Sequence, residues 1–389
     1  AQKVSQSSKL DFSNFLPSLF IIAFLLVGFV PNLDAVDKIA PQWLYLSGLN
    51  ILSGIYLFYK RKAFTYRIFS VISSGMAISY IGFVLWALFS YFYAINPTEV
   101  LVNIVRHFNT LFMFINLGIF IYNIKNKDRL LSLSIMLILS IEIYFVLVQA
   151  LDMYNTTGKV DPGLLKGVTA NRNITAFSIA IKLPYVLFLI FSSKKFFSKL
   201  IYSLTIFLGL FSLSMIESRA SFVAAGAVAV LLFFWTFYLS KKEKSYKNLF
   251  TNLYYLLPMI LALLINQALL EDKGSDALSR AATISLSTND GSVNQRLRYY
   301  EDVLTHITKN PILGTGIGNW KLTSIDYDKK DINGYIVPYH AHSDFIQLGA
   351  ELGIIGFLLY LGVFVFAAYY VFIILFRSQF DLKTKTFIA

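Results

Sequence analysis

Long runs of apolar residues alternate with short polar connections along the whole chain. As a helix, a run of about twenty apolar residues is long enough to cross the roughly 30 Å hydrocarbon core of a bilayer. Backbone groups in lipid must pair within the segment itself, so each run is predicted to be a helix. We expect about ten such helices, near residues 16–30, 41–59, 68–93, 101–124, 130–151, 174–192, 197–215, 219–239, 249–270 and 344–376.

The composition supports this interpretation. Of the 389 residues, 56% are hydrophobic and only 14% are charged, with a mean hydropathy of +0.61. A soluble domain would carry about a quarter charged residues. The absence of cysteine excludes disulfides and thiolate chemistry. No cleavable signal peptide is expected, because the first run enters Pro31 without a small-residue cleavage pattern. The sequence therefore predicts an all-α polytopic membrane protein without a separate soluble domain.

Basic residues are distributed unevenly between the predicted connections. The N-terminal tail, the connections 60–67, 125–129, 194–199 and 241–247, and the tail after Arg377 hold 19 Lys or Arg against 4 Asp or Glu. The opposite connections hold 13 against 17. By the positive-inside rule, the first set and both ends of the chain face the cytoplasm. The net charge of +12 thus reflects topology and does not indicate a nucleic-acid partner.

Two of the four histidines, His340 and His342, directly precede the longest apolar run. Ser343 suits a helix N-cap, and Asp344 places a carboxylate in the first turn, where the helix dipole favours negative charge. His342 would then lie at the water boundary of a membrane-entering helix. Taken alone, the stretch is equally well explained as two solvated surface histidines before an ordinary span.

Glycines follow His342 at regular spacing. Gly349, Gly353 and Gly356 form a small-residue stripe that would let another helix approach closely. The order His342, Ser343, nine residues, Gly353, two residues, Gly356 resembles the His-(Asn/Ser/Gln)-x9-Gly-x-x-(Gly/Thr/Tyr) signature of bacterial O-antigen ligases and related polymerases. In that family the signature follows a long extracytoplasmic loop, and here it follows the outer loop of about residues 271–343.

The outer loop contains a predicted helix. Residues 292–295 form a capping box at its start, and Pro311 stops it. Its apolar residues recur at spacings of four and three, so the helix is expected to lie along the membrane surface or to pack on the spans. These residues are Val293, Leu297, Tyr300, Leu304 and Ile307.

Arg296 and Arg298 flank this stripe. The family pattern has an Arg at the start of the helix and Pro-x-x-Gly-x-Gly-x-Gly downstream. Arg296 and residues 311–318 resemble that pattern, and Arg298 is the alternative if the register differs. The spaced glycines follow a helix stop, not a strand, so a dinucleotide-binding fold is not predicted.

Two earlier segments also resemble the family. Ser218-Arg219-Ala220 matches a Ser-Arg-(Gly/Ala) step whose Arg is attributed to binding the lipid diphosphate; the alternative is a topological anchor. A planar fork of donors at a helix start suits a diphosphate. Residues 167–173 resemble a Gly-x-x-x-Asn-x-Asn segment that contains Arg172 and ends at Asn173. Asn173 is expected to cap the next helix, and either serves only as a cap or also offers its amide to a sugar.

Other candidate sites are weaker. Asp326-Tyr327-Asp328 resembles the metal-binding Asp-x-Asp of nucleotide-sugar-dependent transferases, but a solvated charge run explains it better. His340 and His342 have no third ligand at a spacing typical of zinc. No metal or cofactor is therefore predicted.

Arg106, Glu142 and Lys182 are ionisable residues that lie inside predicted spans. Arg106 lies less than two turns inside one end, where it either extends outward to water or lines a cavity shared with the outer loops. Glu142 and Lys182 lie deeper, and each costs several kcal/mol unless it is paired or wetted. A mutual ion pair or a polar crevice is the expected explanation.

The resemblance covers roughly residue 167 to the end. It implies an inner-membrane glycosyltransferase that takes a glycan from undecaprenyl diphosphate at the periplasmic face, without a metal. The acceptor hydroxyl belongs to lipid A–core, to another glycan in a polymerase, or to a protein in an O-oligosaccharyltransferase. His342 would be the base, Arg219 and Arg296 would hold the diphosphate, and His340 would orient the base or bind the acceptor. A transporter of lipid-linked glycans is the alternative from another class, although no internal repeat is visible.

Four regions follow from these interpretations: nine spans within residues 1–270, a periplasmic loop at 271–343, the last long helix at 344–376 and a cytoplasmic tail at 377–389. Relatives commonly have further spans after the long helix. At about 1.5 Å per residue that helix would be roughly 50 Å long, more than the bilayer core requires. It must tilt, bend near its glycines or project outward, and we expect it to project, with His342 above the bilayer.

Overall fold

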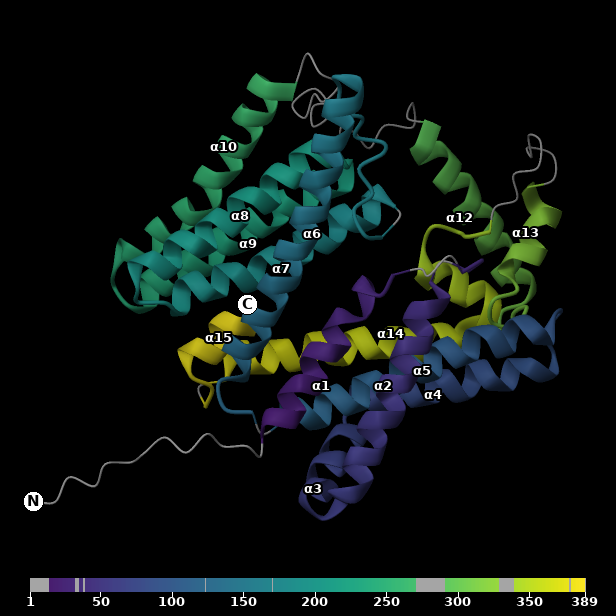
Figure 1. The fold of residues 1–389 in the computed structure, drawn as a ribbon. Coiled ribbons are helices and arrows are strands. Elements are labelled where there is room, and N and C mark those ends of the chain that lie inside the picture. The colour runs from purple at the N-terminus through teal and green to yellow at the C-terminus, as the bar shows by residue number, and fades with distance from the viewer. Residues whose placement is uncertain are drawn as a thin grey trace, which may run out of the picture. The chain divides into compact units, whose positions relative to one another are not determined.

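The computed structural model describes residues 14–31, 35–37, 39–122, 124–169, 171–270, 291–328, 339–377 and 379–388, and every regular element among them is a helix (Figure 1). The elements are α1 (Phe15–Leu25), η2 (Leu26–Phe29), α2 (Ala40–Tyr59), α3 (Arg61–Ile72), α4 (Gly75–Phe89), η3 (Ser90–Phe92), α5 (Pro97–Ile121), α6 (Lys127–Thr157), α7 (Arg172–Ser192), α8 (Phe196–Ile216), α9 (Arg219–Lys242), η4 (Tyr246–Asn252), α10 (Leu253–Leu270), α12 (Gly291–Lys309), α13 (Trp320–Asp328), α14 (Asp344–Phe376) and α15 (Leu382–Ile388). The predicted all-helical membrane fold is confirmed.

Each predicted apolar run coincides with one to three consecutive helical elements. Among the described residues, eight helical segments are long and apolar enough to cross a membrane by length and composition, so the count of ten stays a prediction. The expected connection at 60–67 is wrong, because these residues are helical in α3. The run 68–93 is divided at Ser74, whose Oγ accepts a hydrogen bond from Ala77 N at 3.3 Å and so begins a new helix.

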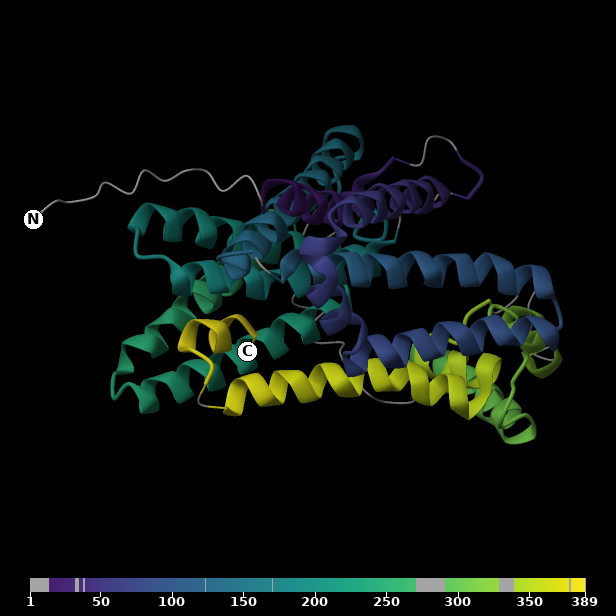
Figure 2. The same cartoon turned by 90° about the horizontal axis from the view of Figure 1, so that it is seen from below.

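The chain folds into two compact units. Unit 1 contains the described residues of 1–124 and 285–372, and unit 2 contains those of 125–284 and 373–389. In unit 1, α14 runs beside α4, as both views show (Figures 1 and 2). Its core joins Phe83 of α4, Ile104 of α5 and Leu352 of α14, and all three are buried.

Unit 2 is built around α7, which packs between α6 and α8. Its buried residues include a charged pair that crosses from α6 to α7. Lys182 Nζ lies 2.9 Å from Glu142 Oε2, and Ser178 Oγ donates to Glu142 Oε1 at 2.7 Å. The carboxylate is only 5% exposed, so the pairing compensates a costly buried charge. The predicted ion pair between Glu142 and Lys182 is confirmed.

The long helix α14 bends at Gly353, whose φ of 66° and ψ of −170° interrupt the helix. A Cβ there would overlap the Ile312 carbonyl oxygen, so only glycine fits the bend. The group that approaches Gly353 is therefore loop backbone, whereas the predicted approach of other helices is seen at Gly349, next to Ile307 of α12, and at Gly356, next to Trp86 of α4. Bending near a glycine was one of the three expected ways to fit this helix, whereas outward projection stays a prediction.

Candidate active site

The helix α12 supplies one wall of the site. It ends at Lys309, just before Pro311, as predicted. Its buried face is different from the predicted apolar stripe, since Leu297 and Leu304 are exposed while Tyr299, Val303 and His306 are buried.

Two polar side chains, Tyr299 and His306, lie on the buried face, and each makes one hydrogen-bond contact there. Gln295 Nε2 donates to Tyr299 Oη at 2.8 Å. His306 Nδ1 lies 3.1 Å from Tyr327 Oη. The predicted stripe was drawn from apolar residues alone, so it does not include the polar residue His306, which is buried. The capping-box side chains of residues 292 and 293 lie outside the described part.

His342 lies against this wall. Its ring stacks on the ring of Tyr299, with centroids 5.8 Å apart and planes 19° apart, and Tyr300 Oη donates to its carbonyl oxygen at 3.3 Å. The backbone of His342 is left-handed, with φ of 57°. A non-glycine residue in that conformation costs about 1–3 kcal/mol, and it persists only where the surroundings determine it. α14 begins at Asp344, as expected of a helix capped at Ser343.

The electrostatics favour a neutral imidazole. Partial burial lowers the pKa of His342 below its usual 6.5, and the positive charge of Arg296 and the ring of His340 lower it further. A neutral imidazole can accept a proton at neutral pH. Unit 1 thus brings Arg296, His340 and His342 close together. Arg298 extends instead over the Tyr299 ring, 5.6 Å from its centroid, so Arg296 is the guanidinium that acts on His342.

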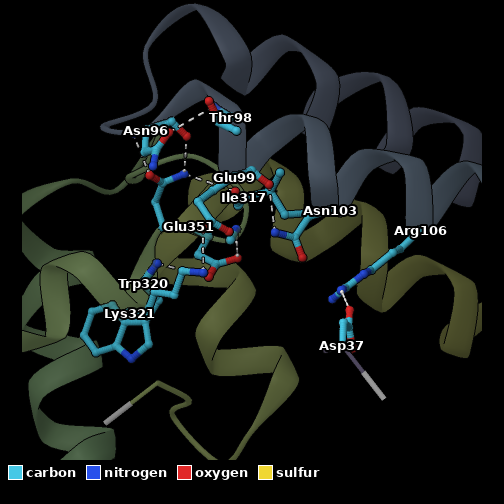
Figure 3. A network of polar contacts seen from close by, with 12 residues as sticks. Asp37, Asn96, Thr98, Glu99, Asn103, Arg106, Ile317, Trp320, Lys321 and Glu351 are labelled. Carbon is cyan, nitrogen blue, oxygen red and sulfur yellow. Dashed lines mark hydrogen bonds and ion pairs between the residues drawn. The ribbon is translucent and has the colours of Figure 1, made fainter. Parts of the chain in front are cut away.

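A buried carboxylate holds the segment before His342 in place. Glu351 is 2% exposed, and its two oxygens accept Gly318 N at 2.8 Å and Trp320 N at 3.2 Å (Figure 3). Gln347 Nε2 donates to Glu351 Oε1 at 3.1 Å, and Gln347 Oε1 accepts Ala341 N at 3.1 Å. This chain of hydrogen bonds ends at Ala341, one residue before His342. No role was predicted for Glu351, although a carboxylate inside the longest apolar run is an unusual feature.

The glycine-rich segment 311–318 packs on the bend of α14. Thr315 N donates to Ala350 O at 3.1 Å and Gly316 N to Glu351 O at 2.8 Å, so these donors pair the carbonyls that the bend releases. Gly314, Gly316 and Gly318 all have positive φ. A Cβ on Gly318 would overlap Asn103 Nδ2, which explains the need for glycine. The segment follows a helix, as predicted.

The remaining unit 1 candidates have defined positions. Arg106 Nη2 lies 3.2 Å from Asp37 Oδ2. Its side chain lines a cavity together with His340, which agrees with the interpretation that Arg106 lines a cavity shared with the outer loops. Asp326 lies in α13, where Tyr327 packs against His306. Among the described residues, no group of three or more metal-ligand side chains occurs.

Unit 2 holds the other candidates at the start of two helices. α8 and α9 meet in a tight turn, and Arg219 is the first residue of α9, as predicted. Ser218 Oγ donates to Asn173 Oδ1 at 3.0 Å, which joins the two family-like segments. Asn173 as helix cap was wrong, because α7 begins at Arg172 and the Asn171 Oδ1 accepts Asn173 N at 2.9 Å. Both positions are asparagine, so a shift of two residues was enough to misplace the cap.

Comparison with known proteins supports the resemblance. Residues 204–361 match the O-antigen ligase family. A protein of Rickettsia bellii named "Putative polysaccharide ligase" is 26% identical over 290 residues, and one of the same name from Rickettsia felis is 25% identical over 289 residues. Each alignment covers 72% of this chain and 64% of the relative, so the chain spans less than two thirds of those relatives. The stretch that matches the O-antigen ligase family, residues 204–361, includes Arg219, Arg296 and His342.

Proposed function

We propose that this protein is a membrane glycosyltransferase of the O-antigen ligase type. It transfers a glycan from undecaprenyl diphosphate to a hydroxyl of an acceptor such as lipid A–core. The observation that carries the proposal is the surroundings of His342: its ring stacks on Tyr299, the Glu351 hydrogen-bond chain holds the residue before it, and partial burial together with the nearby Arg296 lowers the pKa of its imidazole. A polymerase or a protein O-oligosaccharyltransferase would use the same site with another acceptor.

The reaction requires one proton acceptor and one place for released charge. The acceptor hydroxyl gives its proton to His342, and its oxygen attacks the anomeric carbon of the donor sugar. The bond from that carbon to the diphosphate oxygen breaks, and the electron pair leaves with undecaprenyl diphosphate. Attack opposite the leaving group inverts the anomeric configuration. General base catalysis of this kind contributes about 10²–10⁴-fold.

Arg219 and Arg296 stabilise the departing diphosphate in place of a metal. Two guanidinium groups offer bidentate hydrogen bonds to its oxygens, and such bonds are stronger in a partly dry site. Arg219 stands at the start of α9, where the helix dipole adds to the positive potential. Arg172 and Asn173 belong to the same unit 2 cluster and would contact the diphosphate or the first sugar.

The direct test uses purified protein, undecaprenyl-diphosphate-linked glycan and separate acceptors in the presence of EDTA. The expected product is a new glycosidic bond, with activity unchanged by EDTA. Arg219→Lys replaces a planar fork by a point charge, so we expect transfer to fall about 10- to 100-fold, which corresponds to about 1.5–3 kcal/mol for charged hydrogen bonds.

Arg129→Lys is the matched control, since Arg129 is exposed at the start of α6 in the same unit. It should keep full activity. Full activity of Arg219→Lys, or loss of activity with EDTA, would contradict the proposed diphosphate site. Movement of intact lipid-linked glycan across vesicles without any new bond would favour a transporter.

A further inference from the structure

Unit 1 contains a polar cavity of about 530 Å³ beside the segment that carries His342. Such a volume lies in the range of about 300–1,000 Å³ typical of small-molecule sites. One wall is formed by α5, and a second by the residues that lead into α13. The third wall is formed by the segment before α14 together with the first two turns of α14. His340 lines this cavity, whereas His342 lies two residues further along the chain.

The walls are joined by polar contacts, so the cavity exists without a ligand. Lys321 Nζ lies 2.8 Å from Glu99 Oε1 across it (Figure 3). Asn319 Oδ1 accepts Asn96 N at 2.7 Å, and Asn319 Nδ2 donates to Asn96 O at 3.3 Å, which fixes the entry to α13 against the start of α5. Glu351 connects the same segment to α14.

The two positive side chains that line the cavity are each paired with a carboxylate. Lys321 is paired with Glu99, and Arg106 is paired with Asp37. Asp344 at the start of α14 and the buried Glu351 add two more carboxylates to the lining. A diphosphate would meet carboxylate repulsion here, unlike at Arg219 or Arg296. Neutral hydroxyls suit the cavity better, because its carboxylates accept and its ammonium, guanidinium and amide groups donate hydrogen bonds.

Aromatic rings complete the lining. Tyr339 is 60% exposed and Tyr360 also faces the cavity. Such rings present apolar faces and a hydroxyl to a sugar ring. We propose that this cavity binds an uncharged sugar residue of a glycan substrate and thereby presents the hydroxyl-rich chain to the segment that carries His342. The inference rests on the proposed glycan transfer, and the sugar belongs either to the acceptor or to the donor glycan.

The test fills the cavity without removing its polar groups. Val102 of α5 lines the cavity, whereas Val105 of the same helix is 56% exposed and is not part of the lining. Val102→Trp should raise the KM for one glycan substrate at least about tenfold, and Val105→Trp should leave it unchanged. A raised KM for lipid A–core assigns the cavity to the acceptor, and a raised KM for undecaprenyl-diphosphate-linked glycan assigns it to the donor. Unchanged KM values for both substrates would overturn the inference.

Calorimetric titration provides a readout that needs no turnover. Oligosaccharide released from each substrate, free of lipid and diphosphate, is titrated into wild-type protein, Val102→Trp and Val105→Trp. We expect one oligosaccharide to bind wild type and Val105→Trp but not Val102→Trp, and excess inorganic diphosphate not to compete. Absence of binding to wild type, or equal binding to Val102→Trp, would overturn the inference. Blocked binding in a protein that forms no glycosidic bond would support the cavity while refuting the proposed transferase.

Discussion

The ring of His342 rests on Tyr299, its carbonyl oxygen accepts a hydrogen bond from Tyr300, and its backbone is left-handed. These contacts come from neighbouring positions of α12, one turn after Arg296. The same helix therefore sets both the orientation and the charge environment of the imidazole. Under the proposed function, Arg296 therefore has two roles: it binds the diphosphate, and it lowers the pKa of His342.

The two roles of Arg296 separate in a pH profile. The base must be unprotonated, and burial with the nearby Arg296 lowers its pKa, so we expect the acid limb of kcat/KM below pH 6.5. Arg296→Gln removes a positive charge, which raises the pKa of His342 and moves the acid limb to higher pH. Arg296→Lys keeps the charge and should keep the limb near its wild-type position, although both variants bind the diphosphate more weakly. An acid limb that stays fixed in Arg296→Gln would exclude this coupling.

Candidate site residues could be identified from the sequence where they match a family motif. His342 and Arg296 were identified in this way, and the structure brings them together. Tyr299 and Glu351 were missed, because their roles depend on contacts with distant segments: Tyr299 meets His342 across 43 positions of sequence, and Glu351 meets Gly318 across 33. Asn173 was wrongly predicted as the cap of α7, because asparagine is a favoured N-cap residue and Asn171 fits that preference equally well.

At the scale of elements, the bend of α14 links the motifs. The bend at Gly353 leaves carbonyl groups of α14 without their helical hydrogen bonds. Backbone N–H groups of the glycine-rich segment donate to two of them, the carbonyl oxygens of Ala350 and Glu351. Trp86 Nε1 of α4 donates to Leu352 O at 2.9 Å. The elements were predictable from apolar runs because helix formation in lipid is a local requirement. The bend was not uniquely predictable, since its position depends on which backbone groups another segment can pair.

The bend gives a stability prediction. Gly353→Ala places a Cβ against the Ile312 carbonyl oxygen and imposes a left-handed conformation on alanine. The conformational part alone costs about 1–3 kcal/mol, so the melting temperature in detergent should fall by several degrees. Gly48→Ala is the control, because Gly48 lies in α2 and a Cβ added there would have nothing within 4 Å. That variant should be unchanged or slightly more stable. Equal melting of both variants would contradict the account of the bend.

At the scale of the whole molecule, the two units carry complementary candidates. Unit 1 contains His342, Arg296 and the polar cavity, and unit 2 contains Arg219 with the Asn173–Ser218 contact. The charge difference between alternate connections predicts which ends of the helices face the cytoplasm. The proposed common role of Arg219, Arg296 and His342 comes from the family resemblance, since apolar runs and charge counts contain no information about which helices pack together.

The predicted topology can be tested by labelling, because the chain has no cysteine. Lys62→Cys and Glu301→Cys introduce single thiols at exposed positions of α3 and α12. In spheroplasts, a membrane-impermeant maleimide should label Glu301→Cys, whereas Lys62→Cys should react only after the membrane is permeabilised. The reverse pattern would place His342 on the cytoplasmic side and contradict a periplasmic site.

The central claim is that His342 accepts the proton of the attacking hydroxyl. The most direct measurement is the single-turnover rate of glycan transfer by purified His342→Ala and wild type, with bound undecaprenyl-diphosphate-linked glycan quantified in both. We predict a rate about 10²–10⁴-fold lower for His342→Ala, with donor binding retained. A near-normal transfer rate in His342→Ala would remove the imidazole from the reaction and contradict the account.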